Sequence, residues 1–269
     1  MQSQSPSVRL AYFSIPAVHQ ALGNTMPNET KPALLVSYVY LQPFLDNQHK
    51  YNYRDWVLDS GAFSVKNSGK EIKLQDYIDC CKRLMDSDNT LTKIYSLDVI
   101  GDWRASIKNA EEMWRQGVPA IPVYHTGEPW DALKAIAKDY PKIAIGGVAL
   151  YSAKQKTKWA EQCFARVWPK RIHGFGYGSA SSIMALPWDS VDATNWELGP
   201  CKFGQWRSFG KMSVRGSNQN LRSEVEYYLK LERKARSKFG KLLEGLGSEH
   251  NYRLSSASKN SPRDLSEAF

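Results

Sequence analysis

Residues 93–125 read KIYSLDVIGDWRASIKNAEEMWRQGVPAIPVYH, and this stretch carries the pattern that decides the fold. Its two ends, Lys93–Leu97 and Ala120–Tyr124, are short apolar runs typical of strands. Asp102 stands where it would cap a helix between them. The apolar face of that helix recurs at helical spacing and consists of Trp103, Ile107, Ala110, Met113 and Trp114. The segment therefore predicts a strand–helix–strand unit with two parallel strands.

The same alternation extends in both directions from this unit. Helical patterns begin near Leu74 and at Pro129. Further strands are expected at Arg9–Ser14, Ala33–Tyr40, Asp55–Leu58, Lys142–Ile145, Arg171–Phe175 and Ser190–Val191. About eight strands, with a repeat of roughly 30 residues, predict an α/β fold, a (β/α)₈ TIM barrel over residues 1–215. An open, doubly wound sheet stays as the alternative, because periodicity does not show closure.

Positive charge gathers near the C-terminus of the 269 residues, whose formal net charge is +9. Between Lys202 and Lys241 there are eleven Lys and Arg but only three acidic residues. We expect a basic C-terminal helix over residues 216–246, capped by Ser217 or Asn218, and a flexible polar tail over residues 247–269. Such an excess favours a polyanionic partner, either nucleic acid or an anionic surface, over a merely solvated basic face.

The composition excludes several classes of protein. A hydrophobic content of 42% argues against a disordered or collagen-like chain. No apolar stretch reaches the roughly 18 residues of a membrane span, and the first residues lack the pattern of a secretory signal. The four cysteines show no spacing typical of zinc ligands, so we expect free thiols in a reducing compartment, the cytoplasm.

Polar residues follow the expected strands where a TIM barrel carries its active site. Asp59, Asp98 and Asp192 follow three strands, and His125 follows a fourth. Each alone is typical of a turn or a cap, but three like charges in one barrel mouth repel each other and lower stability. Paired carboxylates suit chemistry at a glycosidic carbon, and the basic arm makes a nucleic-acid glycosidic bond the natural substrate.

Five strand-end segments resemble, in order, motifs of the tRNA-guanine transglycosylase (queuine tRNA-ribosyltransferase) superfamily. They are Asp59–Phe63, Ser96–Asp98, Ile145–Ala149, His173–Gly178 and Ser190–Thr194. Their counterparts in the family are its DSGG(Y/F)Q motif, its second aspartate motif, its GGLAVGE strand end, its HYLMGVG segment and its FDCVLPTR nucleophile. The resemblance covers roughly residues 55 to 200, which is most of the expected barrel.

The resemblance implies a role for each matched residue. Asp192 would be the nucleophile that attacks C1′, and Asp59 would be the general acid and base. Asp98 would recognise the purine-like edge of the base, and Phe63 would stack on it. Gly146 and Gly147 would offer backbone hydrogen bonds. The remaining substrate-binding positions are Ser60, His125, Phe175 and Gly176.

This chain also departs from the superfamily. It lacks the CxCxxC…His zinc site and is shorter than the tRNA enzymes, so it looks most similar to compact bacteriophage and bacterial relatives that insert 7-deazaguanines into DNA. We therefore predict a pentosyltransferase that exchanges guanine in DNA for a free 7-deazaguanine such as preQ0, without metal or cofactor, in the host cytoplasm if a phage encodes it. The expected contacts to the nucleic-acid backbone are Arg207, Lys211, Arg215, Lys230, Arg233 and Lys234.

Other functions remain open at this stage. The same chemistry on tRNA is the first alternative, and the second is either a barrel hydrolase of N-glycosides or a non-catalytic nucleic-acid-binding barrel. Asp189 is the alternative nucleophile, although it looks more like a turn residue after Trp188. A homodimer also remains open.

Overall fold

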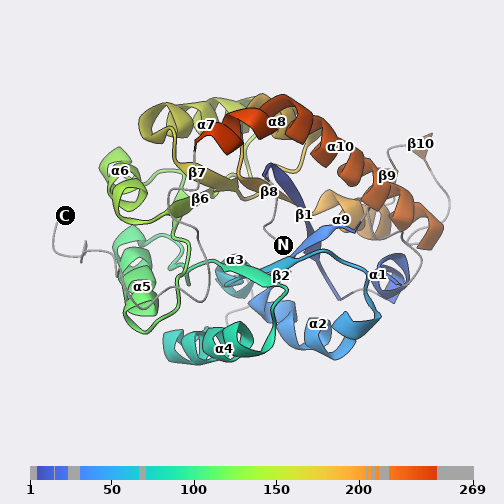
Figure 1. Cartoon of the computed structure of the whole chain (residues 1–269), viewed down its shortest axis with the longest axis horizontal. Coiled ribbons are helices and arrows are strands. Elements are labelled where there is room, and N and C mark those ends of the chain that lie inside the picture. The colour runs from blue at the N-terminus through green and yellow to red at the C-terminus, as the bar shows by residue number, and fades with distance from the viewer. Residues whose placement is uncertain are drawn as a thin grey trace.

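Eight parallel strands form the centre of the molecule (Figure 1). The computed structural model describes residues 5–14, 16–23, 31–66, 71–203, 205–206, 210–211 and 218–246. The strands are β1 (Ser7–Tyr12), β2 (Ala33–Ser37), β3 (Trp56–Asp59), β4 (Leu91–Ile94), β5 (Val123–His125), β6 (Lys142–Gly146), β7 (Arg171–Gly174) and β8 (Ser190–Ala193). Their order in the sheet is β4-β3-β2-β1-β8-β7-β6-β5. A parallel bridge between Tyr95 and Ile121 joins the two ends and closes the ring.

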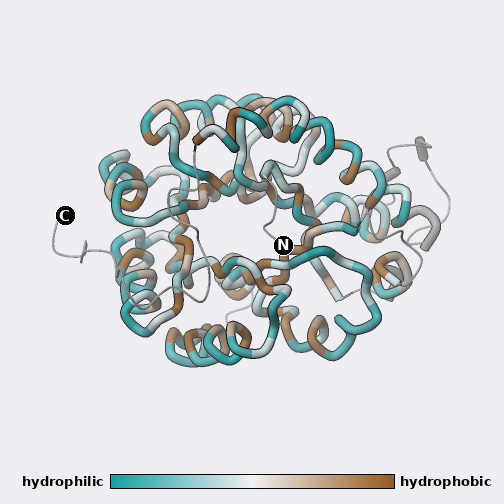
Figure 2. The backbone as a smooth tube through the Cα atoms, viewed as in Figure 1, coloured by the Kyte–Doolittle hydropathy of each residue, from teal (hydrophilic) through white to brown (hydrophobic). Residues whose placement is uncertain are grey.

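Helices surround this ring, as the predicted TIM barrel requires (Figure 1). They are α1 (Pro16–Ala21), α2 (Leu41–Asn47), α3 (Ala62–Lys66), α4 (Leu74–Ser87), α5 (Trp103–Arg115), α6 (Trp130–Asp139), α7 (Ala153–Val167), α8 (Ala180–Ala185), α9 (Asn195–Phe203) and α10 (Asn218–Gly245). Hydrophobic and hydrophilic residues alternate along the outer helices (Figure 2). The predicted fold class is therefore confirmed, and the open doubly wound sheet is excluded. Among the described residues, none of these helices is long and apolar enough to cross a bilayer.

All eight predicted strands exist, with bounds that differ by a few residues. The largest difference is in the fourth strand, which is expected at Lys93–Leu97 and observed at Leu91–Ile94. In the second strand, Tyr38–Tyr40 forms a 3₁₀ turn instead of continuing β2. The predicted cap of α5 is confirmed, because the carboxylate of Asp102 accepts a hydrogen bond of 3.0 Å from the N–H of Ala105. Pro129 is itself the N-cap of α6 rather than its first helical residue.

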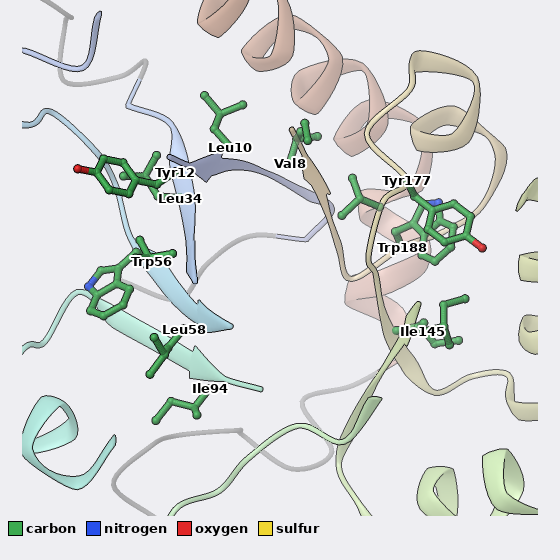
Figure 3. Close-up of a cluster of buried hydrophobic side chains, with 14 of the residues drawn as sticks. Val8, Leu10, Tyr12, Leu34, Trp56, Leu58, Ile94, Ile145, Tyr177 and Trp188 are labelled. Atoms are coloured by element: carbon green, nitrogen blue, oxygen red, sulfur yellow. The ribbon is translucent and has the colours of Figure 1, made fainter. Parts of the chain in front are cut away.

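Side chains along β3 alternate between two hydrophobic clusters, because successive side chains of a strand point to opposite faces. The larger cluster lies between the strands and the helices and includes Trp56 and Leu58 of β3 (Figure 3). The smaller cluster fills the barrel and includes Val57. Val57 shares its face with Asp59, so the carboxylate of Asp59 points into the barrel at the C-terminal end of β3.

The C-terminal helix α10 packs against β1, α1, α8 and α9. Its buried face contains the apolar residues that the sequence pattern predicted, Leu221, Val225, Tyr228, Leu229, Leu231 and Ala235. The carboxylate of Glu232 accepts a hydrogen bond of 2.8 Å from the N–H of Val8, at the start of β1. Arg171, the first residue of β7, donates a hydrogen bond of 2.7 Å to the carbonyl of Leu243. The central and C-terminal parts of α10 therefore lie at the N-terminal ends of the strands.

Several predicted features lie outside the described residues. These are Arg207, Arg215 and the tail of residues 247–269. Lys211 belongs to a short hairpin of β9 (Gln205–Trp206) and β10 (Gly210–Lys211), but its side chain is also outside the description.

Candidate active site

The barrel mouth is the opening at the C-terminal ends of the strands, and most of the predicted site residues meet there. Val57, Val123 and Ala144 belong to the cluster inside the barrel. Asp59, His125 and Gly146 each follow one of them by two residues. They share its inward face, because side-chain direction repeats every two residues. The predicted convergence of strand ends is thus present in the structure.

Asp192 lies within β8 and is only 5% exposed. Its Oδ1 accepts a short hydrogen bond of 2.6 Å from the backbone N–H of Gly176. Burial raises the pKa of Asp192 to about 6, although the Gly176 hydrogen bond and the ammonium of Lys156 oppose that rise. A buried carboxylate with one oxygen held by a backbone donor is oriented and partly desolvated, which suits a nucleophile.

Asp59 shows the stronger perturbation of the two carboxyl groups. Its pKa is raised to about 7, first by burial and then by the negative charges of Asp98 and Asp192. A hydrogen bond of 3.1 Å from the N–H of Gly61 to its Oδ2 acts in the opposite direction. Gly61 has a φ of 76°, and a Cβ there would lie 2.6 Å from Ser37 Oγ, so this turn requires glycine. A carboxyl group that titrates near neutral pH can both donate and accept a proton.

His125 lies between two carboxylates. Its Nε2 lies 3.4 Å from Asp98 Oδ2, and its Nδ1 lies 3.2 Å from Glu128 Oε1. Burial lowers the pKa of His125, but these two carboxylates outweigh that effect and raise it to about 10. The imidazole therefore stays protonated at neutral pH and orients Asp98. Within the described part of the chain, Asp98 Oδ1 is buried and has no hydrogen-bond partner, so it can accept a bond from a ligand.

The glycine and phenylalanine residues of the matched segments form one side of the mouth. Phe175 packs edge-on against Tyr95, with ring centroids 4.8 Å apart. A Cβ on Gly146 would lie 3.3 Å from Phe175 and 3.6 Å from His125. Because Gly146 has no side chain, Phe175 and His125 can pack close to the backbone of β6 on this side of the mouth. The N–H of Gly176, which we expected to bind substrate, instead binds the carboxylate of Asp192.

Three other predicted residues lie at the edge of the site. The hydroxyl of Ser60 accepts a weak hydrogen bond of 3.5 Å from the N–H of Ala62 and so belongs to the turn after β3. Phe63 is 61% exposed on α3. Gly147 is exposed, and its carbonyl accepts a hydrogen bond of 3.0 Å from Thr126. Phe63 and Gly147 therefore border the mouth, and the carboxylates lie inside it.

Sequence reasoning missed two charged residues of this site. One carboxylate oxygen of Glu128 accepts a hydrogen bond of 3.0 Å from the backbone N–H of His125, and the other lies 3.2 Å from His125 Nδ1. Its position three residues after a strand-end histidine was the available signal. Lys156 of α7 donates a hydrogen bond of 3.2 Å to the carbonyl of Gly176, and its charge lowers the pKa of Asp192. Nothing in the strand-end pattern pointed to Lys156, because it comes from the following helix.

The basic residues of α10 are not beside these carboxylates. Lys230, Arg233 and Lys234 are exposed and line a surface pocket together with Tyr227. They flank Glu232, whose carboxylate contacts the start of β1 and Arg54, just before β3. We expected a basic arm next to the site, but the structure places these residues at the opposite ends of the strands. Their contact with a nucleic-acid backbone stays a prediction.

Asp189 is likewise remote from the mouth. It precedes β8 and lies at the N-terminal ends of the strands, where its carboxylate contacts Lys93 at 2.6 Å and Lys142 at 3.1 Å. The positive charges around it hold the pKa of Asp189 well below its usual range despite complete burial. This environment makes Asp189 a structural ion-pair residue, so it does not replace Asp192 as a candidate nucleophile. In the described ranges, no group of three or more His, Cys, Asp or Glu side chains is arranged to hold a metal ion.

Comparisons with known proteins identify the fold only. No family model matches the chain, and no curated protein matches it. The solved structure of the YdjI aldolase from Escherichia coli K12 has a TM-score of 0.50 at 10% identity and covers 87% of this chain and 91% of its own. A putative fructose-1,6-biphosphate aldolase from Coccidioides immitis has a TM-score of 0.49 at 9% identity, over 87% of this chain and 90% of its own. The first of these likenesses places the chain in the class of TIM barrels.

The crowded carboxylates lead to a prediction about stability. The pKa of Asp59 is raised above its unfolded value, so Asp59 lowers the stability of the folded protein progressively as the pH rises from about 4, where the unfolded carboxyl ionises, to about 7. We expect Asp59→Asn to raise the free energy of unfolding by a few kcal/mol at pH 8 and by clearly less at pH 5. Urea denaturation of both proteins at both pH values measures this difference. An equal effect at the two pH values would show that Asp59 is not a raised-pKa group.

Proposed function

We propose that this chain is a transglycosylase that exchanges guanine in DNA for a free 7-deazaguanine base such as preQ0. The observation that carries the proposal is the pair of carboxyl groups in the mouth, the buried Asp192 with a pKa of about 6 and the half-buried Asp59 with a pKa of about 7. Two carboxyl groups with different protonation states supply a nucleophile and a proton donor, which glycosidic chemistry requires.

The reaction has two balanced halves. The carboxylate of Asp192 attacks C1′ while the bond from C1′ to N9 of guanine breaks, and protonated Asp59 gives its proton to the departing base. This step leaves an ester between Asp192 and C1′, free guanine and ionised Asp59. Asp59 then removes the N9 proton of the incoming 7-deazaguanine, N9 attacks C1′, and the carboxylate of Asp192 leaves.

The group around His125 fits recognition of a guanine-like edge. Such an edge presents the N1–H and the exocyclic amino group as donors, and these need acceptors. Burial raises the pKa of Asp98, but the protonated His125 beside Oδ2 opposes that rise and favours the carboxylate. The buried Oδ1 has no partner in the described part of the chain and can accept these bonds. Adenine presents an acceptor at N1 and would leave Asp98 Oδ1 without a hydrogen bond, which costs binding energy.

A base-exchange assay tests the proposal directly. Duplex DNA, single-stranded DNA and tRNA are each incubated with the protein, labelled guanine and preQ0, and the nucleosides are then analysed by mass spectrometry. The proposal expects label and preQ0 to enter DNA. Exchange confined to tRNA would show that the substrate is tRNA and not DNA. Release of base without incorporation would identify a hydrolase instead.

The two pKa values also predict the pH profile of the first half-reaction. Asp192 must be ionised, so activity should rise as the pH increases through about 6. Asp59 must be protonated, so activity should fall as the pH increases through about 7. We expect a narrow bell-shaped profile of kcat/KM between pH 5 and 9. In Asp59→Asn the residual activity should lose the alkaline limb, and retention of that limb would assign it to another group.

A further inference from the structure

Exposed apolar side chains gather on the loops that surround the barrel mouth. The described residues include seven large hydrophobic side chains with substantial exposure, and five of them lie in segments that directly follow a strand. These five are Val39 after β2, Phe63 after β3, Val99 after β4, and Leu150 and Tyr151 after β6. Leu150 is 98% exposed, the highest value among them. Exposed apolar residues that cluster around a site are typical of a contact surface.

The loop with Leu150 is held in one conformation by its own hydrogen bonds. The N–H of Tyr151 donates to the carbonyl of Val148 at 3.0 Å. Ser152 and Gln155 form a capping box that begins α7. Leu150 is therefore presented to solvent by a defined turn.

Lysines follow this loop immediately. Lys154, Lys156 and Lys158 lie in the first turns of α7, and its first turn contains no acidic residue. Lys154 and Lys158 are exposed and four residues apart, so they share one face of the helix. Glu161, one turn after Lys158, is the only acidic residue of α7. This face therefore has a net positive charge.

The same segment is linked to the candidate nucleophile by two hydrogen bonds. Lys156 Nζ donates to the carbonyl of Gly176 at 3.2 Å, and the N–H of Gly176 donates to Asp192 Oδ1 at 2.6 Å. Lys156 thus joins α7 to the strand end that holds Asp192, whereas Lys230 and Lys234 lie at the other end of the barrel. Lys154 and Lys158 belong to the same two turns of α7 but lie on its exposed side, because residues two apart point to different sides of a helix.

We propose that residues 150–158 bind the nucleic-acid strand that contains the target nucleotide, with Lys154 and Lys158 on its phosphates and Leu150 against the base stack. This proposal rests on the proposed function. A base must leave the stack to reach Asp59 and Asp192, and an exposed apolar side chain can then contact the bases that remain. Positive charge beside an apolar tip matches the chemistry of a phosphate backbone beside stacked bases.

Binding is measured by fluorescence anisotropy with a labelled duplex, over a range of salt concentrations, in the Asp192→Ala background so that no exchange is needed. We expect Lys154→Ala/Lys158→Ala to weaken binding by about tenfold or more at low salt and to reduce the slope of log affinity against log salt by roughly two. The matched control is Lys134→Ala/Lys138→Ala, which removes two exposed lysines at the same spacing from α6. Equal affinities for the two double variants would overturn the proposal.

Leu150→Ala separates contact with the base stack from attraction by charge. With 2-aminopurine at the target position, we expect this variant to show at least a severalfold smaller fluorescence increase on duplex DNA than the parent protein, at an unchanged salt slope. The same variant should bind single-stranded DNA as the parent does. A change in the sedimentation of the protein alone would identify the apolar rim as an interface between two copies of the chain and would overturn the proposal. Since these measurements need no exchange, they remain informative if the base-exchange assay fails.

Discussion

Replacing Asp192 with alanine is expected to abolish the covalent adduct between the protein and nucleic acid and to reduce base exchange by at least about a thousandfold. The side chain is 5% exposed, and one of its oxygens is held at 2.6 Å by the N–H of Gly176. Asp59 also has one oxygen held by a backbone donor, the N–H of Gly61 at 3.1 Å, but it ends β3 and cannot take the position of Asp192 within β8. Denaturing gel electrophoresis of the protein with labelled DNA measures the adduct.

Two further variants make this result specific. Asp59→Asn should still form the adduct, more slowly, because it lacks the proton donor but retains the nucleophile. Asp131→Asn removes a carboxylate whose side chain is 78% exposed on α6 and should behave as the unmodified protein does. An adduct that persists in Asp192→Ala and disappears in Asp59→Ala would mean that Asp59 is the nucleophile and Asp192 the proton donor.

The barrel and the positions of its carboxylates could be predicted because both depend on local periodicity. Apolar runs that repeat with intervening helices define parallel strands, and the residue that ends such a strand is at the mouth of any TIM barrel. Asp59 is an example, because its direction follows from Val57 two residues earlier. This reasoning needs no knowledge of contacts between distant residues.

The perturbations within the site could not be predicted in the same way. The pKa of Asp59 depends on burial and on the charges of Asp98, in the segment after β4, and Asp192, in β8. The protonation of His125 depends partly on Glu128. Glu128 follows the strand-end histidine, but the pattern gave no reason to choose it as a site residue. The first effect requires distances across the barrel, and the second requires the conformation of the loop after β5.

The position of the basic helix could not be predicted either. The spacing of Leu221, Val225 and Tyr228 defines the buried face of α10, but it does not specify what that face covers. The position is set by single contacts between distant residues, such as Glu232 with the N–H of Val8. A concentration of charge along the sequence therefore indicated a partner without indicating its place on the molecule.

Replacing Asp189 with asparagine is expected to lower the free energy of unfolding by about 3–5 kcal/mol at pH 6. Asp189 is 3% exposed and neutralises Lys93, whose side chain is 8% exposed and whose ammonium lies 2.6 Å away. Lys142 contacts the same carboxylate at 3.1 Å. The variant leaves these positive charges without their partner, and an unpaired buried charge costs far more than a lost surface ion pair.

The loss of stability should depend on pH in a defined direction. Burial is the main cause that lowers the pKa of Lys93 to about 7, and the charge of Asp189 opposes that effect. Without Asp189 the pKa of Lys93 falls further, so Lys93 is neutral in the folded variant at pH 8.5. Its folded pKa is then far below its unfolded value, so stability falls as the pH decreases towards that folded value. We therefore expect a smaller deficit at pH 8.5 than at pH 6, measured by urea denaturation. Asp131→Asn, which removes only a surface pair with Lys134, should change stability by less than about 0.5 kcal/mol at both pH values. A deficit that is the same at both pH values would mean that Lys93 does not respond to Asp189, and the network would then have to be assigned to Lys142 alone.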